Sequence, residues 1–340
     1  MSERVAVITS SYPREPGDAA GHFVASEVRR WLEQGAEVHV FAPGVGQGER
    51  DGDTLASSGK AARGEACVHW VADGGAFGWP GALARLRERP LRAVGAAAFT
   101  LGVRRTLRSV GPFTRVQAHF LVPCAWPIAT TAFGPAREMA FELVGHGSDV
   151  RLFCGLPSAL RRHIARAWLR RGAHLRVTSE ELAARLRAAN PELSEVLWVK
   201  PSPLELGAVL SRREARASLG IAANARVALV VSRLVPEKRV AVALRALSLV
   251  DGVSAIVVGD GPESSALRTE FPSVRFVGHV ARPTALAYIA AADVLVSASR
   301  DEGAPSVVRE ARALGVAVVA VAAGDLAEWA NSDPGIFAIR

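Results

Sequence analysis

Residues 294–311 read VLVSASRDEGAPSVVREA, and this stretch contains the pattern that decides the fold. The apolar run Val294–Ser297 predicts a short buried strand, and residues 305–314 predict a helix that begins at Pro305. Between them, Gly303 permits the backbone to approach a ligand closely. A buried strand leading through a Gly- and Pro-containing loop into a helix is the repeating unit of a parallel α/β sheet.

The same alternation runs through both halves of the chain. A linker at residues 200–207, with two prolines, separates two series of strands and helices. We therefore predict two Rossmann-like, doubly wound α/β domains, residues 1–203 and 204–340, facing each other across a cleft that binds the ligand. The predicted strands are 5–9, 37–41, 116–119, 141–144 and 175–178 in the first domain, and 227–231, 255–258, 275–277, 294–297 and 316–320 in the second.

The composition is that of a globular protein. Of the 340 residues, 49% are hydrophobic and 22% are charged, which excludes a disordered chain. Residues 1–10 lead directly into a strand pattern, and the uncharged stretch 120–136 is shorter than the roughly 20 residues of a membrane span. The three cysteines, Cys67, Cys124 and Cys154, show neither disulfide nor metal-ligand spacing, so we expect a cytoplasmic protein.

The positive charge is concentrated in the first half. Residues 1–205 carry 26 basic and 20 acidic side chains, a net charge of +6, out of +8 for the whole chain. This balance favours an anionic partner, while the sparse aromatic residues argue against nucleic acid. Residues 83–115 hold eight arginines and one glutamate around an apolar stripe. They predict either a helix lying on an anionic membrane surface or a core-facing helix with solvated arginines. The stripe consists of Leu91, Val94, Ala98 and Leu101.

Two cations follow the first predicted strand of the second domain. Arg233 and Lys238 lie five residues apart in the loop after residues 227–231. Arginine grips phosphate bidentately and lysine acts as a mobile point charge, so the pair suits a diphosphate. A solvated turn is the alternative. Lys238 is one of three lysines among 41 basic residues, which favours function.

Two glutamates flank the loop in which the fold-deciding helix begins. Glu302 precedes the helix and Glu310 lies one to two turns inside it. Carboxylates accept hydrogen bonds from neighbouring sugar hydroxyls, and the unpaired N–H groups of a helix start attract an anion. We interpret the pair as ligands of a sugar and a ribose, against the alternative of two surface glutamates. The turn containing Gly259, after residues 255–258, is a weaker signal.

The first domain offers two histidines and an aspartate at predicted strand ends. His119 ends the strand 116–119, and His146 and Asp149 follow the strand 141–144. A histidine in such a position reaches a sugar or moves a proton. A satisfied structural histidine is the alternative.

These motifs resemble those of the retaining GT-B fold glycosyltransferases of family 4, the glycosyl transferases group 1, over nearly the whole chain. The resemblance implies that Glu310 binds the nucleotide ribose and that Glu302 contacts the donor sugar. It assigns the donor diphosphate to Arg233 and Lys238, and places His119 against the donor sugar.

The resemblance also assigns the remaining positions and the chemistry. Further donor contacts fall on Gly21, Gly259, Val280, Gly303, Ala304, Pro305 and Ser306, and the acceptor side on His146 and Asp149. A sugar then passes with retention, without a metal or other cofactor, from a UDP, GDP or ADP donor to a glycan, lipid or metabolite of the cell surface. The implied location is the cytoplasm, with peripheral attachment to the inner face of the membrane.

The sequence departs from the family pattern in three places. Residues 200–203 read KPSP where relatives have Asn-Gly-Val-Asp, and Gly324-Asp325 replaces a pair of glycines. The sequence ends at Arg340, where relatives continue with helices that return to the first domain. We expect weaker coupling of the domains and reduced activity from this ending. A sugar-nucleotide epimerase and a catalytically silent partner subunit of the same fold are the alternative functions.

Overall fold

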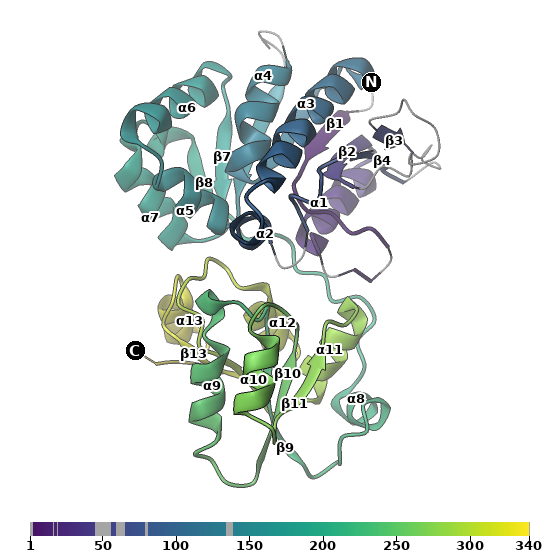
Figure 1. Ribbon diagram of the computed structural model, residues 1–340, viewed down its shortest axis with the longest axis vertical. Coiled ribbons are helices and arrows are strands. Elements are labelled where there is room, and N and C mark those ends of the chain that lie inside the picture. The colour runs from purple at the N-terminus through teal and green to yellow at the C-terminus, as the bar shows by residue number, and fades with distance from the viewer. Residues whose placement is uncertain are drawn as a thin grey trace. The chain divides into compact units, whose positions relative to one another are not determined.

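The computed structural model describes residues 3–15, 17–18, 20–44, 56–58, 65–78, 81–133 and 139–339. The chain divides into two compact units (Figure 1). The first unit comprises Met1–Arg14 with Ala20–Pro203, and the second comprises Glu15–Ala19 with Leu204–Arg340. The main division falls between Pro203 and Leu204, where the sequence analysis places the domain boundary.

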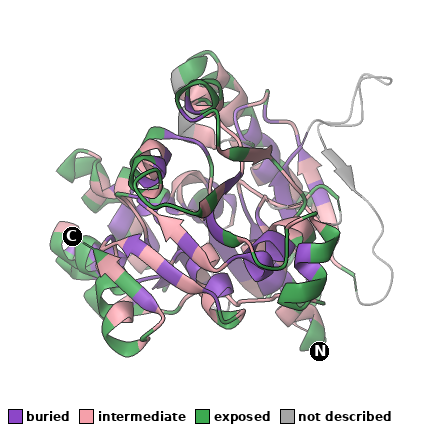
Figure 2. Cartoon of the chain, turned by 90° about the horizontal axis from the view of Figure 1, so that it is seen from below, coloured by how far each residue is buried: buried purple, intermediate pink, exposed green. Residues whose placement is uncertain are grey.

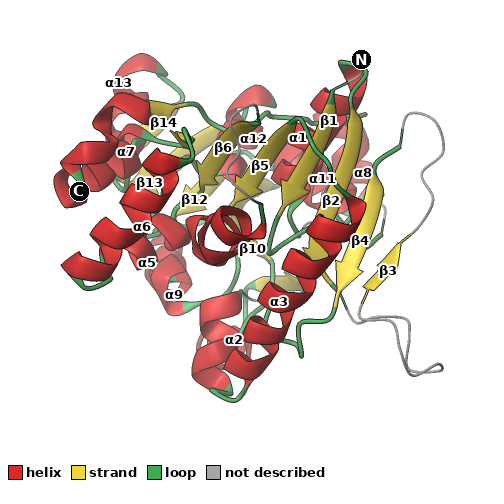
Figure 3. Ribbon diagram, turned by 90° about the horizontal axis from the view of Figure 1, so that it is seen from above, coloured by secondary structure: helices red, strands yellow, loops and turns green. Residues whose placement is uncertain are grey.

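An eight-stranded sheet forms the centre of the first unit. Its strand order is β3-β4-β2-β1-β5-β6-β7-β8, and every neighbouring pair is parallel except β3 with β4. Figure 3 shows β3 beside β4 at the edge of this sheet. The strands are β1 (Arg4–Ile8), β2 (Glu37–Pro43), β3 (Ala56–Ser58), β4 (Cys67–Val71), β5 (Arg115–His119), β6 (Ala140–Gly145), β7 (His174–Val177) and β8 (Leu197–Val199).

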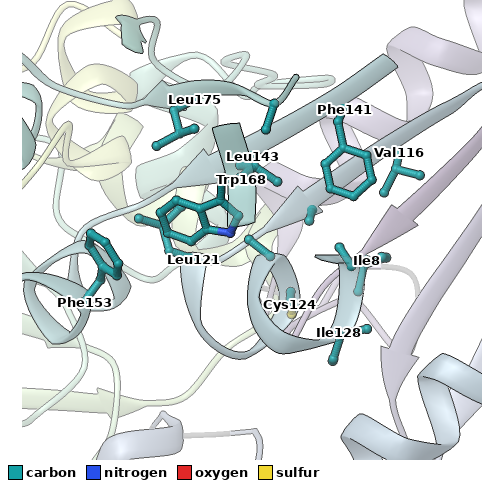
Figure 4. Packing of buried hydrophobic residues seen from close by; sticks show 14 of the residues in the cluster. Ile8, Val116, Leu121, Cys124, Ile128, Phe141, Leu143, Phe153, Trp168 and Leu175 are labelled. Carbon is teal, nitrogen blue, oxygen red and sulfur yellow. The ribbon is translucent and has the colours of Figure 1, made fainter. Parts of the chain in front are cut away.

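Helices cover both faces of the first sheet. On one face Val24 and Val28 of α1 pack with alternate residues of β1 and β2, and on the other Trp168 of α6 lies among Leu121, Leu143 and Leu175 (Figure 4). The first-unit helices are α1 (His22–Glu33), α2 (Ala82–Glu88), α3 (Arg92–Val110), α4 (Thr130–Ala132), α5 (Ser148–Cys154), α6 (Ser158–Arg170) and α7 (Glu180–Ala189), with shorter or irregular segments η1 (Leu121–Ala129) and η2 (Pro191–Val196).

The second unit contains a six-stranded parallel sheet. Its order is β11-β10-β9-β12-β13-β14, which is the Rossmann order 3-2-1-4-5-6. The strands are β9 (Arg226–Val231), β10 (Val253–Val258), β11 (Arg275–Gly278), β12 (Val294–Ser297), β13 (Ala317–Val321) and β14 (Ile336–Ile339). The helices are α8 (Arg212–Ser218), η3 (Pro236–Lys238), α9 (Val240–Leu247), α10 (Ser264–Glu270), α11 (Arg282–Ala291), α12 (Ser306–Ala313) and α13 (Leu326–Ser332).

Each strand of the second sheet contributes to two cores. Leu229 and Val318 belong to the cluster on one face, while Val230 and Val257 belong to the cluster on the other. Figure 2 shows the same pattern, with buried residues in the strands and exposed residues on the outer sides of the helices. Alternate strand residues therefore pack under helices on both faces, so the predicted fold class of two doubly wound α/β units is confirmed.

Every strand predicted from the sequence is present, with boundaries that differ by at most two residues. Strands β3, β4, β8 and β14 were not predicted. Two details differ from the prediction. Pro305 lies just before α12 as its N-cap, so the helix begins at Ser306, and residues 83–115 contain two helices rather than one.

The apolar stripe of residues 83–115 is exposed within its unit. Leu91 is 86% exposed and Val94 is 72% exposed, while Leu101 is about half exposed. A different face of α3 is buried, with Phe99, Val103 and Leu107 in the core. The helix α3 therefore faces the core, as the second interpretation predicts, but through residues other than the stripe. Within the described residues, no helix is both long enough and apolar enough to cross a membrane.

Candidate active site

The predicted site residues of the second unit gather where the strand order changes direction. Chain connections leave β9 toward β10 on one side and β12 toward β13 on the other, so the carboxyl ends of β9 and β12 mark the point where sheets of this kind form a ligand-binding crevice. Arg233 and Lys238 follow β9, and Glu302 follows β12. The topology therefore brings together residues that lie more than 60 positions apart in the sequence.

The two loops at this point are joined by an ion pair. Lys238 Nζ lies 2.5 Å from Glu302 Oε1, and both side chains are mostly buried. The backbone strengthens the junction, because the N–H of Arg300 donates to the carbonyl of Glu237 at 3.0 Å. Arg233 lies near Glu237 and Glu302, and although part of its side chain is exposed, partial desolvation lowers the pKa of its guanidinium. Two cations and two carboxylates thus share one small volume.

Glycine allows the loop after β10 to pack directly on the loop after β9. Gly259 has φ of +132°, and a Cβ atom on it would lie 1.8 Å from the carbonyl oxygen of Ser232. Next to it, the N–H of Leu234 donates to the carbonyl of Asp260 at 2.8 Å. Gly259 therefore has a structural reason for its identity, because any side chain would push the loop carrying Arg233 away.

Glu310, the second predicted glutamate of the site, is buried. It lies in α12 and is 5% exposed, and its Oε1 accepts a hydrogen bond from Arg282 Nη1 at 2.7 Å. Arg282 is the first residue of α11, two positions after the predicted contact Val280, which packs partly buried against the core. Sequence reasoning missed Arg282. Its position at the carboxyl end of β11 was the signal that could have found it.

The loop between β12 and α12 carries the other predicted donor contacts. Gly303 and Pro305 are buried, while Ala304 and Ser306 are half-buried. The carbonyls of Glu302 and Gly303 pack against Gly324, where a Cβ atom would lie 2.6 Å from the Glu302 oxygen. The first turn of α12 presents its N–H groups at this loop. Gly324 is thus a second supporting glycine, and it stands where the family has a glycine pair.

His119 and His146 form a stacked pair in the first unit. Their rings are 5.2 Å apart, and His119 Nδ1 lies 3.0 Å from His146 Nε2. His119 is fully buried, and its Nε2 lies 3.2 Å from Gln117 Oε1. Burial and the neighbouring His146 lower the pKa of His119 well below its usual value. Burial and Arg176 lower the pKa of His146 to about 3. Both rings are therefore neutral at neutral pH, so a role in positioning fits His119 better than proton transfer.

The carboxylate of Asp149 accepts hydrogen bonds from backbone N–H groups. Its Oδ1 accepts from the N–H groups of His146 and Gly147 at 3.0 and 2.9 Å, and its Oδ2 accepts from the N–H of Leu121 at 2.8 Å. The carboxylate is buried and already holds three hydrogen bonds. Asp149 therefore fixes the loop that carries His146.

Gly21 and Phe120 mark two tight points of the first unit. Gly21, with φ of +64°, precedes α1, and a Cβ atom there would lie 2.3 Å from the carbonyl oxygen of Ser11. Phe120 follows His119 with φ of +73°, an uncommon conformation for a residue with a side chain. Its ring lies 4.9 Å from that of His146, and the ring of Phe23 lies 4.6 Å from that of His146. This aromatic group was not predicted.

Solved structures establish the class of fold. Sucrose-phosphate synthase from Thermosynechococcus elongatus superposes with a TM-score of 0.71 at 20% identity, covering 95% of this chain and 82% of that one. Anabaena HepE in complex with UDP-glucose gives a TM-score of 0.61 at 19% identity, over 96% and 82% of the two chains. These are similarities of fold, and the fold is GT-B.

Sequence similarity identifies the family of the second unit. Residues 225–339 match the model of the glycosyl transferases group 1, so the expected resemblance to that group is confirmed and the second unit carries the domain of that family. TuaC of Bacillus subtilis, a protein assigned to teichuronic acid biosynthesis as a glycosyltransferase, is 31% identical over 218 residues. The match covers 62% of this chain and 53% of TuaC, so the chain spans about half the length of that relative.

Proposed function

We propose that this protein transfers a sugar from a nucleoside diphosphate donor to a glycan, lipid or metabolite acceptor in the synthesis of a cell-surface polysaccharide or glycoconjugate. One observation carries the proposal: Lys238 and Glu302 meet at 2.5 Å at the change of strand order in the second unit, beside Arg233. The match to the glycosyl transferases group 1 covers these residues, and HepE was solved with UDP-glucose.

The cations neutralise the departing diphosphate. Breaking the bond between the sugar and the diphosphate leaves two negative charges on the terminal phosphate, which Arg233 and Lys238 stabilise together with the N–H groups at the start of α12. Lys238 exchanges its partner Glu302 for phosphate when the donor binds. Because these groups supply the positive charge, we propose that the reaction needs no metal.

The acids bind hydroxyl groups. Glu302 precedes α12 in the loop that meets Lys238, so it is placed to bind a sugar attached to the diphosphate. Glu310 lies deeper, is held by Arg282, and binds the two hydroxyls of the ribose. A carboxylate held by a guanidinium is already oriented, so it loses less side-chain entropy on binding. We propose retention of configuration at the anomeric carbon, with the departing phosphate accepting the proton of the acceptor.

Calorimetric titration with UDP-, GDP- and ADP-glucose tests the donor site. We expect one nucleotide class to bind, and Lys238→Ala to weaken binding strongly. The matched control is Lys200→Ala, because Lys200 is an exposed lysine that follows β8. Binding of no donor would contradict the proposal and favour the silent-partner function. Equal binding by the two lysine variants would remove Lys238 from the site.

An epimerase on the same fold predicts a different product. It changes the configuration of the donor sugar without an acceptor, whereas a transferase leaves an intact donor unchanged until an acceptor is present. Proton NMR of the bound nucleotide class, incubated with the protein alone, separates the two. A second sugar configuration appearing in the spectrum would replace the transferase proposal with the epimerase.

We also propose that the first unit docks on an anionic membrane surface through α3. Leu91, Val94 and Leu101 are exposed there, and arginines flank them in α2 and α3. Apolar residues enter the interface while arginines meet the headgroups, so binding weakens as salt rises. Co-sedimentation with phosphatidylglycerol vesicles tests this proposal, with Leu91→Ser/Val94→Ser as the variant and Leu249→Ser, an equally exposed leucine of the second unit, as the control. An unbound wild-type protein at low salt would refute it.

A further inference from the structure

Three metal-ligating side chains lie together on the sheet of the first unit. His39 is in β2, and Cys67 and His69 are in the neighbouring parallel strand β4. The register pairs His39 with Cys67 and Phe41 with His69. Because alternate residues of a strand share a face, all three side chains project from the same side of the sheet. They lie in the amino-terminal half or at the middle of these strands, whereas His119 and His146 lie at the carboxyl ends of β5 and β6.

The three potential ligand atoms are close enough to share one ion. An imidazole nitrogen of each histidine and the Cys67 sulfur all lie within 4.8 Å of one another, and His39 Nδ1 is 3.0 Å from His69 Nε2. Two nitrogens bound tetrahedrally to one zinc ion, each about 2.0–2.1 Å from it, are roughly 3.3 Å apart. Small rotations of the two rings therefore suffice to admit the ion.

Glu37 prepares His39 for this role. Its Oε1 lies 2.8 Å from His39 Nε2, so the ring donates its Nε2 proton to the carboxylate and keeps a lone pair on Nδ1. The guanidinium of Arg4 lies 3.0 Å from the same carboxylate and 3.3 Å from His39 Nε2, so Glu37 also offsets the nearest positive charge. A carboxylate holding the far side of a metal-binding imidazole is the usual outer shell of such sites.

The burial of the group differs from one ligand to the next. His39 and His69 are 7% and 4% exposed, between Phe41 and Phe113, while Cys67 is half-buried. The aromatic rings fix the two imidazoles, and Cys67 is the least buried of the three ligands. Oxygen-preferring ions such as Mg²⁺ and Ca²⁺ are disfavoured by this donor set. Two imidazoles and a thiolate suit zinc and its neighbours among the transition metals.

We propose that His39, Cys67 and His69 form a binding site for a transition-metal ion of the zinc class, with Glu37 as the residue that orients His39. A water molecule or other small ligand completes the four-coordinate shell. The ion joins β4 to β2 and so closes the chain segment between them, which stabilises this side of the first sheet. The site shares no residue with the proposed donor site, and sugar transfer does not require it.

Titration of the full chain with Zn²⁺, after treatment with a chelator and a thiol reductant, tests the proposal. We expect one equivalent to bind with a dissociation constant of about 1 μM or lower. Cys67→Ser should weaken binding by more than about 100-fold, and Glu37→Gln by roughly 10-fold. The matched control is Cys154→Ser, because Cys154 is also a half-buried cysteine of the first unit. His174→Asn, at an exposed histidine, is the second control.

Cobalt gives a readout that does not depend on any variant. Co²⁺ bound by Cys67 should produce a thiolate-to-metal charge-transfer band in the near ultraviolet and the intense visible bands of a four-coordinate ion. Added Zn²⁺ should displace Co²⁺ and so abolish both the charge-transfer band and the visible bands. In a separate measurement, Zn²⁺ should raise the Tm of the wild-type protein but not that of Cys67→Ser. Absence of the thiolate band in the wild-type protein, or equal loss of Zn²⁺ binding in Cys67→Ser and Cys154→Ser, would overturn the proposal.

Discussion

Apart from the edge strands β3 and β8, the two units share a strand order, but they carry opposite kinds of chemistry at the same topological position. In each unit the order changes direction beside the first strand, between β1 and β5 and between β9 and β12. The first unit places neutral histidines and aromatic rings there, around His119 and His146. The second places Arg233, Lys238 and Glu302.

This difference separates what topology does from what side chains do. The strand order creates a crevice at the carboxyl ends of the strands in both units, whatever residues occupy it. The charged crevice suits a diphosphate, because its cations are partly desolvated and paired with carboxylates. The uncharged, aromatic crevice suits the apolar face of a sugar. The fold therefore selects the place, and the residues after each strand select the ligand.

The largest effect is expected where the two loops of the charged crevice pack together. Gly259→Ala should lower the free energy of unfolding of the second unit by more than about 4 kcal/mol, because the new methyl group meets the backbone of Ser232. Gly220→Ala is the control, since Gly220 also has a positive φ but has no atom within 4 Å of the added Cβ. Its cost should be about 1 kcal/mol, the strain alone. Urea denaturation measures both, and equal costs would show that the packing is dispensable.

Removing Lys238, one of the two proposed diphosphate-binding cations, should slow the reaction. Lys238→Ala should lower kcat by roughly 100- to 1000-fold, because one electrostatic partner of the leaving diphosphate is lost. Steady-state kinetics with the donor identified by titration measures the effect. Part of the loss arises from the unpaired Glu302, and Lys238→Ala/Glu302→Gln isolates that part. A normal kcat in the single variant would mean that the charged crevice is not where the reaction occurs.

Breaking the ion pair between Glu310 and Arg282 should lower the stability of the second unit. Glu310→Ala leaves Arg282 without its carboxylate and should cost about 3 kcal/mol of unfolding free energy, together with most of the affinity for the nucleotide. Glu328→Ala, at an exposed glutamate of α13, should change neither quantity. If denaturation and calorimetry found the two variants alike, the assignment of Glu310 to the ribose would fail.

Mild acid should lower the stability of the first unit, which contains the neutral His146. The pKa of His146 is lowered to about 3, so the unfolded chain binds a proton below pH 6.5 that the folded unit does not bind. Stability is therefore present above pH 6.5 and falls as the pH decreases toward 3, by about 2 kcal/mol between pH 7 and 5. Six of the seven tryptophans lie in residues 1–203, so their fluorescence reports on this unit. His146→Gln should flatten the dependence, and His174→Gln, at an exposed histidine, should leave it unchanged.

The strands and their order of appearance were predictable because a buried parallel strand is a short apolar run bounded by turns. Residues 227–231, VALVV, show this plainly, and β9 forms there. Strand β4 was missed because its sequence, CVHWV, places Cys67 and His69 where an apolar run was sought. Tertiary contacts decide that strand, since β2 lies beside it and Phe41 packs on His69.

The sequence by itself determined the two α/β units, the loop cations and the two glutamates, because strand periodicity and strand-end position are local properties of the chain. Only the tertiary structure decided which groups meet. In the folded chain Lys238 pairs with Glu302, and Arg282 pairs with Glu310. Asp149 accepts hydrogen bonds from backbone N–H groups, and the stripe at Leu91 is exposed. The tertiary structure also gathered His39, Cys67 and His69, whose spacing indicates no metal site. These contacts depend on sheet register and helix packing, which link residues far apart in the sequence.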